Sequence, residues 1–119
     1  MSKITKEELL AFLKGRLTKA EREKEAFLVK AQEDLSGALE WSMEAFRAAA
    51  TIQLATEMVQ ALEDPEAGNT AQHTLEYAAR NAMRCMENPR RSTCPVSNLI
   101  HQEQGRFYAE IARTDWRNR

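Results

Sequence analysis

The strongest constraint in the sequence is a spacing of three and four residues between mostly apolar positions, which continues without a gap over residues 28–59. Its positions are Leu28, Ala31, Leu35, Ala38, Ser42, Ala45, Ala49, Ile52, Thr56 and Val59. Such spacing places one side chain per turn on a single face of an α-helix, as in coiled coils. It predicts one long helix over about 19–63. The alternative is a break near Ser36-Gly37, but an interior glycine costs only about 1 kcal/mol and the spacing continues through it.

The composition argues against a β-sheet. Alanine occurs 18 times, whereas valine and isoleucine together occur 7 times, and the chain has only 4 glycines and 3 prolines. Strands favour β-branched residues, and sheets need frequent turns. A chain of 119 residues is also the size of one domain. We therefore expect an all-α fold, a small bundle of four or five helices around one long central helix, in a single domain covering 1–119.

Capping signals divide the N-terminal part of the chain. Residues 5–8 (Thr-Lys-Glu-Glu) form a capping box, which marks the start of a helix. Gly15 lies where a glycine commonly ends a helix, so the pattern predicts a short N-terminal helix within residues 1–17. A second capping box at residues 18–21 (Thr-Lys-Ala-Glu) then predicts the start of the long helix.

Turn-forming residues mark two later breaks. The segment 63–69 (Glu-Asp-Pro-Glu-Ala-Gly-Asn) is the clearest break in the chain, and it predicts a helix over 70–87. A second loop follows at 88–95 and ends in a proline, which suits the first turn of a helix. The last helix is therefore expected over 95–114.

The second half of the predicted long helix is apolar on more than one side. A helix of this kind must be enclosed, and the other predicted helices are too short to enclose it. One stripe, here called the alanine seam, is predicted to be either core or dimer surface, and we expect a homodimer. The alanine seam consists of Ala38, Trp41, Ala45, Ala49, Ile52 and Val59. A further stripe on the same helix contains Leu39, Met43, Phe46 and Ala50.

Several classes of protein are disfavoured by the sequence. No run of 18 apolar residues occurs, so we expect no membrane-spanning helix. The charged segment MSKITKEELL lacks the apolar core of a signal peptide, and 2 cysteines cannot build a disulfide-rich scaffold. These features predict a cytoplasmic protein with free thiols.

Motifs for metal binding and catalysis are missing from the sequence. Neither His73 nor His101 has a glutamate three residues before it, as a di-iron helical bundle requires. Cys85 and Cys94 have no second cysteine pair with which to form a zinc site, and no glycine-rich phosphate loop is present. We expect no metal, no cofactor and no enzymatic activity.

Basic residues are unevenly distributed along the chain. Residues 1–64 carry 9 basic and 12 acidic side chains, a net charge of −3, whereas residues 65–119 carry 8 basic and 6 acidic side chains, a net charge of +2. All the basic residues of the second half are arginines, which make two-pronged contacts with carboxylates and phosphates. The predicted contact residues combine these arginines with nearby aromatic side chains. They are Tyr77, Arg80, Arg84, Arg90, Arg91, Arg106, Arg113 and Trp116.

Three interpretations of this arginine set are open. Arginine, tyrosine and tryptophan are enriched at the energetic centres of protein interfaces. We therefore expect stoichiometric docking on a partner protein with an acidic surface, as an inhibitor, adaptor or regulatory accessory subunit of a bacterium or phage. The alternative is a nucleic-acid-binding accessory factor, in which arginines bind phosphates and aromatic rings stack on bases. The third interpretation is a solvated face of local ion pairs, such as Glu76–Arg80, Glu103–Arg106 and Glu110–Arg113.

Overall fold

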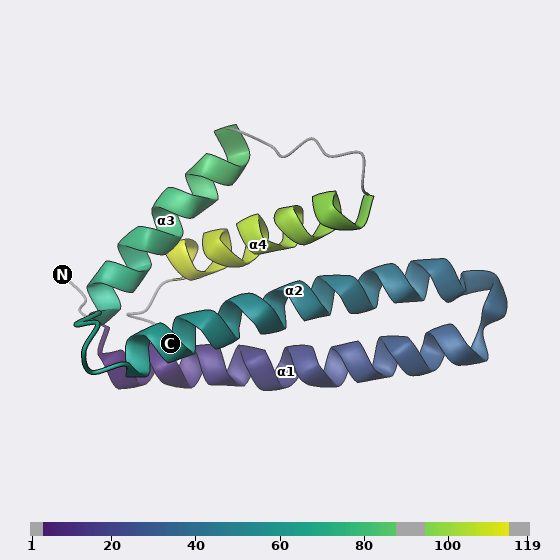
Figure 1. Ribbon diagram of the computed structural model, residues 1–119, viewed down its shortest axis with the longest axis horizontal. Helices are drawn as coiled ribbons and strands as arrows, with labels where there is room; N and C mark the ends of the chain where they lie inside the picture. The colour runs from purple at the N-terminus through teal and green to yellow at the C-terminus, as the bar shows by residue number, and fades with distance from the viewer. Residues whose placement is uncertain (1–3, 88–94, 115–119) are drawn as a thin grey trace.

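The computed structural model describes residues 4–87 and 95–114, which form four α-helices and no strand (Figure 1). In chain order these helices are α1 (Lys6–Glu33), α2 (Ala38–Glu63), α3 (Ala71–Glu87) and α4 (Pro95–Arg113), with a short 3-10 turn, η1 (Leu35–Gly37), between α1 and α2. The prediction of a small all-α bundle is confirmed. The boundaries of its first half differ from those expected.

Helix α1 begins at the predicted capping box and then continues through Gly15. The Thr5 hydroxyl accepts a hydrogen bond from the Glu8 backbone amide at 3.1 Å. Thr18, predicted to cap a new helix, donates its hydroxyl to the Lys14 carbonyl at 3.0 Å within the same helix. The predicted end near residue 17 is therefore wrong. Burial of Leu9 and Leu13 on one face outweighs the small cost of an exposed interior glycine.

The predicted helix over 19–63 is broken at Asp34, so the alternative break near Ser36-Gly37 is the correct one. The Asp34 carboxylate accepts hydrogen bonds from the Gly37 amide at 3.2 Å, the Ser36 hydroxyl at 2.8 Å and Trp41 Nε1 at 3.2 Å. A Cβ at Gly37 would lie 2.6 Å from Asp34 Oδ2, so any larger residue there would displace the Asp34 carboxylate. These hydrogen bonds lower the pKa of Asp34 below its ordinary value of 3.8, the one from Ser36 most strongly.

Helices α1 and α2 form an antiparallel hairpin (Figure 1), and part of the alanine seam is buried in the structure. Trp41 stacks on Phe27 of α1, with ring centroids 6.0 Å apart, and Ala45 and Val59 are buried. The other seam residues are partly buried. The core interpretation of the seam therefore fits Trp41, Ala45 and Val59, and the expected homodimer stays a prediction.

Helix α4 lies against α2 and runs in the same direction, while α3 packs mainly on α4 (Figure 1). Leu62 of α2 and Ile111 of α4 join Leu9 and Leu13 as the large, fully buried side chains of the core. Helices α3 and α4 approach closely at Gly105, where a Cβ would lie 3.0 Å from the Cβ of Cys85. Contact between α3 and α2 is sparse, which leaves a recess between them.

The two glycines of the first hairpin predict opposite effects of the same substitution. Gly15→Ala should stabilise the protein by about 0.5–1 kcal/mol, because a Cβ there meets nothing and alanine favours the helix. Gly37→Ala should destabilise it by about 1 kcal/mol or more, because the Cβ displaces the hydrogen-bonded Asp34 carboxylate. Urea denaturation followed by circular dichroism measures both. If both substitutions changed the free energy of unfolding in the same direction, the role given to Gly37 would be contradicted.

Candidate interaction surface

A recess of about 460 Å³ opens where α3 diverges from α2. Its floor is apolar and is formed by the buried side chains of Leu54 and Met58 from α2. The recess exists because the chain turns away after α2, and Asn69 holds this turn by donating to the Ala61 carbonyl at 3.1 Å. A concave apolar floor with polar walls is the usual form of a binding site. The polar and aromatic walls are Glu57, Asn69, His73, Thr74, Tyr77, Arg80 and Tyr108.

Three of the predicted contact residues form an exposed row on α3. Tyr77, Arg80 and Arg84 are three and four residues apart, so they share one face of the helix. Tyr77 is 50% exposed, and both arginines are exposed. We call these residues the α3 row. It borders the recess, because Tyr77 and Arg80 contribute to the recess wall.

The arginines of the α3 row have no ion-pair partner among the side chains that the structure describes. The predicted pair between Glu76 and Arg80 does not form, and Glu76 instead accepts a hydrogen bond from Gln72 at 3.3 Å. The interpretation of the arginines as locally neutralised therefore does not apply to this part of α3. Among the described residues, no carboxylate neutralises their positive charge.

A pair of tyrosines joins α3 to α4 at the wall of the recess. The rings of Tyr77 and Tyr108 meet edge to face, with centroids 6.0 Å apart. Burial raises the pKa of Tyr108 well above its ordinary value of 10.0, and the neighbouring Tyr77 and Glu57 raise it further. Tyr108 therefore keeps its proton at neutral pH and presents a neutral hydroxyl to the recess.

The arginines of α4 belong to a different face. Arg106 and Arg113 share a side of α4, as predicted, but they line a separate hollow with Arg16 and Glu110. Tyr108 follows Arg106 by two residues and so points roughly the opposite way. Among the described residues, the arginines of α3 and those of α4 therefore do not line the same hollow. Arg90, Arg91 and Trp116 lie outside the described residues.

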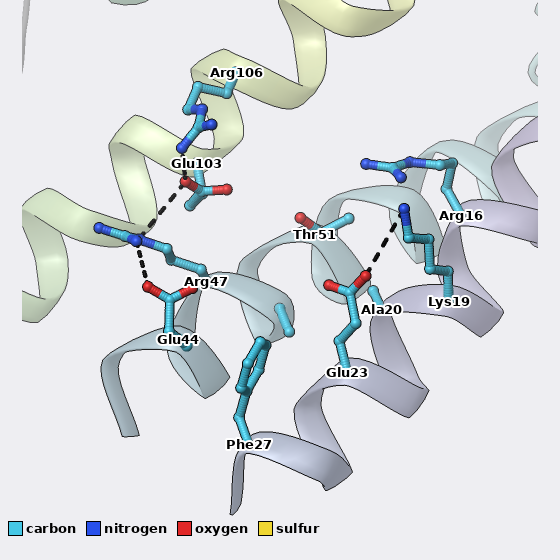
Figure 2. Close-up of a pocket in the computed structure, with 11 residues that line it drawn as sticks. Arg16, Lys19, Ala20, Glu23, Phe27, Glu44, Arg47, Thr51, Glu103 and Arg106 are labelled. Carbon is cyan, nitrogen blue, oxygen red and sulfur yellow. Dashed lines mark hydrogen bonds and ion pairs between the residues drawn. The ribbon is translucent and has the colours of Figure 1, made fainter. Parts of the chain in front are cut away.

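Figure 2 shows the ionic contacts on this second face, in a polar hollow of about 300 Å³ between α1, α2 and α4. Glu103 accepts from Arg106 at 2.8 Å, which confirms that predicted pair, and lies 3.8 Å from Arg47 Nε. Glu110 pairs with Arg16 at 2.9 Å rather than with Arg113. Arg16 and Arg47 have carboxylate partners on α4, whereas Arg106 pairs within α4 and Arg113 forms no ion pair with the described side chains. The ion pairs of this face therefore link α1 and α2 to α4.

The residues considered for metal binding do not converge in the described part of the chain, where no group of three or more histidine, cysteine or acidic side chains could hold an ion. His73 is exposed at the recess, while Cys85 is a half-buried free thiol against α4. Cys94 lies outside the described residues. None of the helices in the described segments has the length and apolar character needed to cross a bilayer.

Sequence reasoning found the α3 row but missed the recess beside it and the partners of Arg16 and Arg47. The row follows from helical spacing within one element. The recess depends on the angle between α2 and α3, and the pair Arg16–Glu110 joins residues 94 positions apart. Comparisons with protein-family models, with curated proteins and with solved structures found no match to this chain.

The burial of Tyr108 predicts a measurable shift in tyrosine ionisation. Tyr77→Phe leaves Tyr108 as the single tyrosine, because the chain has only 2. Its ionisation, followed by ultraviolet absorbance, should occur at higher pH in the folded protein than in denaturant, since burial is the main cause of the shift. A raised folded pKa stabilises the protein below pH 10, and this stabilisation is lost as the pH rises further. Identical titrations in both states would contradict this assignment.

Proposed function

We propose that this chain is a non-enzymatic binding protein that docks stoichiometrically on a partner protein through the α3 row and the adjoining recess. The observation that carries the proposal is the exposed pair Arg80 and Arg84, which lacks carboxylate partners in the described structure and lies beside an apolar floor. Arginine and tyrosine around a desolvated pocket are typical of interface hot spots. The proposed partner carries an acidic group for the arginines and an apolar side chain for the recess.

The distribution of charge favours a protein partner over a nucleic acid. A nucleic acid needs a continuous series of phosphate contacts, whereas the arginines of α3 and α4 face different directions. Glu57 also lines the recess and would repel a phosphate backbone passing over it. A short acidic and apolar protein surface can place its carboxylates near the α3 row while keeping them away from Glu57.

The proposed role is that of an inhibitor, adaptor or regulatory accessory subunit in the cytoplasm of a bacterium or of a phage-infected cell. This role needs docking but no reaction. His73, the titratable imidazole at the recess, is exposed, and the described thiol, Cys85, lies at the contact between α3 and α4 and outside the recess. The proposal therefore assigns binding, and not catalysis, to this surface.

Charge reversal on the α3 row tests the proposal. Arg80→Glu with Arg84→Glu should abolish capture of the partner from a lysate of the native cells, because two attractive contacts become repulsive. The matched control is Arg22→Glu with Lys24→Glu, which makes the same change of charge on exposed residues of α1. The control should retain capture, and all variants should keep the helicity of the parent protein.

The identity of the captured material distinguishes the candidate functions. A polypeptide recovered at a fixed molar ratio, insensitive to nuclease and released by salt, supports protein docking. Recovery of nucleic acid, detected from the ratio of absorbances, would support the alternative function. Equal capture by the α3-row variant and the control would show that the partner uses another surface.

A further inference from the structure

The turn between α1 and α2 exposes large apolar side chains at one end of the long axis of the molecule (Figure 1). Leu35 is 85% exposed and Leu39 is 75% exposed. Leu39 belongs to the same stripe of α2 as Ala50, which is buried. The stripe is uncovered at its beginning because α4 begins farther along α2 than the turn (Figure 1). Exposed leucines at such a projection are typical of a contact site.

The same end of the molecule has a net negative charge. Residues 30–44 include the acidic side chains Glu33, Asp34, Glu40 and Glu44 and one basic side chain, Lys30, whose ammonium lies over the Trp41 ring. Asp34 is occupied by the hydrogen bonds of the turn, and Glu44 pairs with Arg47. Glu33 and Glu40 are exposed and form no ion pair with the described side chains. We call the group Glu33, Leu35, Leu39 and Glu40 the hairpin end.

The hairpin end has the chemistry that the α3 row and the recess require of a partner. It combines two free carboxylates with two exposed leucines, whereas the other surface combines two free arginines with an apolar floor. We propose that the partner of the α3 row and recess is a second copy of this chain, which docks its hairpin end there. This inference rests on the proposed function and names the partner. It differs from the homodimer expected along the alanine seam.

The placement of the two surfaces makes the contact intermolecular. The hairpin end lies at one end of the molecule's 50 Å long axis, and α3 begins at the other end (Figure 1). A chain therefore cannot dock on itself. Pairing two hairpin ends with each other would bring Glu33 and Glu40 of both copies together, which is unfavourable. The contact is instead head to tail, so each added copy leaves a free surface at both ends of the assembly.

Within this contact, the charges determine the orientation. The leucines of the hairpin end lie over the recess floor of Leu54 and Met58. Its glutamates face Arg80 and Arg84 on the α3 side, away from Glu57 on the α2 side. The contact is small, so self-association should be weak, dependent on concentration and reduced by salt.

Paired charge reversals test the inference by sedimentation of the purified full chain. The parent protein should exceed the single-chain mass of 13.6 kDa increasingly with concentration. In the variant Arg80→Glu with Arg84→Glu, the α3 row becomes acidic like the hairpin end. In the variant Glu33→Lys with Glu40→Lys, the hairpin end becomes basic like the α3 row. Each variant alone should associate more weakly than the parent protein by about tenfold or more. An equimolar mixture should recover association, because each acidic surface then meets a basic one.

A matched control and distinct outcomes separate this inference from the proposed function. Glu21→Lys with Glu25→Lys makes the same change of charge as the hairpin-end variant, but on exposed residues of α1, and it should leave association unchanged. A parent protein that stays at 13.6 kDa at every concentration would overturn the inference. Capture from a lysate decides the proposed function separately. Recovery through the α3 row of a polypeptide other than this chain would support that function and would overturn the second copy as its partner. Association of the parent without recovery in the mixture would overturn the head-to-tail arrangement.

Discussion

The reversal of the chain at Asp34 is the interaction on which the rest of the structure depends. Asp34 ends α1 with its backbone amide, which donates to the Lys30 carbonyl, and its carboxylate accepts the Gly37 amide that leads into α2 and the indole N–H of Trp41 one turn farther on. Without this reversal, residues 28–59 would extend as one rod and would lack an internal partner. With it, α1 becomes the covering helix for α2, and the position of α2 then determines where α4 and α3 can pack.

The apolar spacing predicted the buried positions Ala45 and Val59 of α2, but it also included Leu35, which is exposed, and it gave the wrong chain path. In an antiparallel helical hairpin, the stripes that face each other continue the same spacing through the turn. Phe27 and Trp41 stack across the hairpin, although along the sequence both fit a helix that passes through Gly37. Spacing alone cannot distinguish one long helix from two folded arms. The evidence for the turn lay in the side chain of Asp34, a local hydrogen-bonding group that a count of apolar positions does not include.

A similar distinction explains what could be predicted about the candidate site. The alignment of Tyr77, Arg80 and Arg84 follows from one helix, so the sequence was sufficient. The separation of Arg106 from Arg80 follows from the packing of α3 on α4, which depends on contacts such as Cys85 with Gly105. The expectation that residues 38–62 need covering was correct for the second half of α2, where Leu54, Ala55 and Leu62 are buried. That half of α2 is covered by other helices of the same chain, and only the first turns of α2 remain exposed.

The tight approach of α3 to α4 at Gly105 has a consequence for the width of the recess. Helix α3 forms one wall of the recess, and farther along the helix Cys85 rests against Gly105 of α4. Any side chain at position 105 would push α3 away from α4, and so would a bulky group added to the Cys85 sulfur. The aperture available to a ligand thus depends on a glycine that does not line the recess.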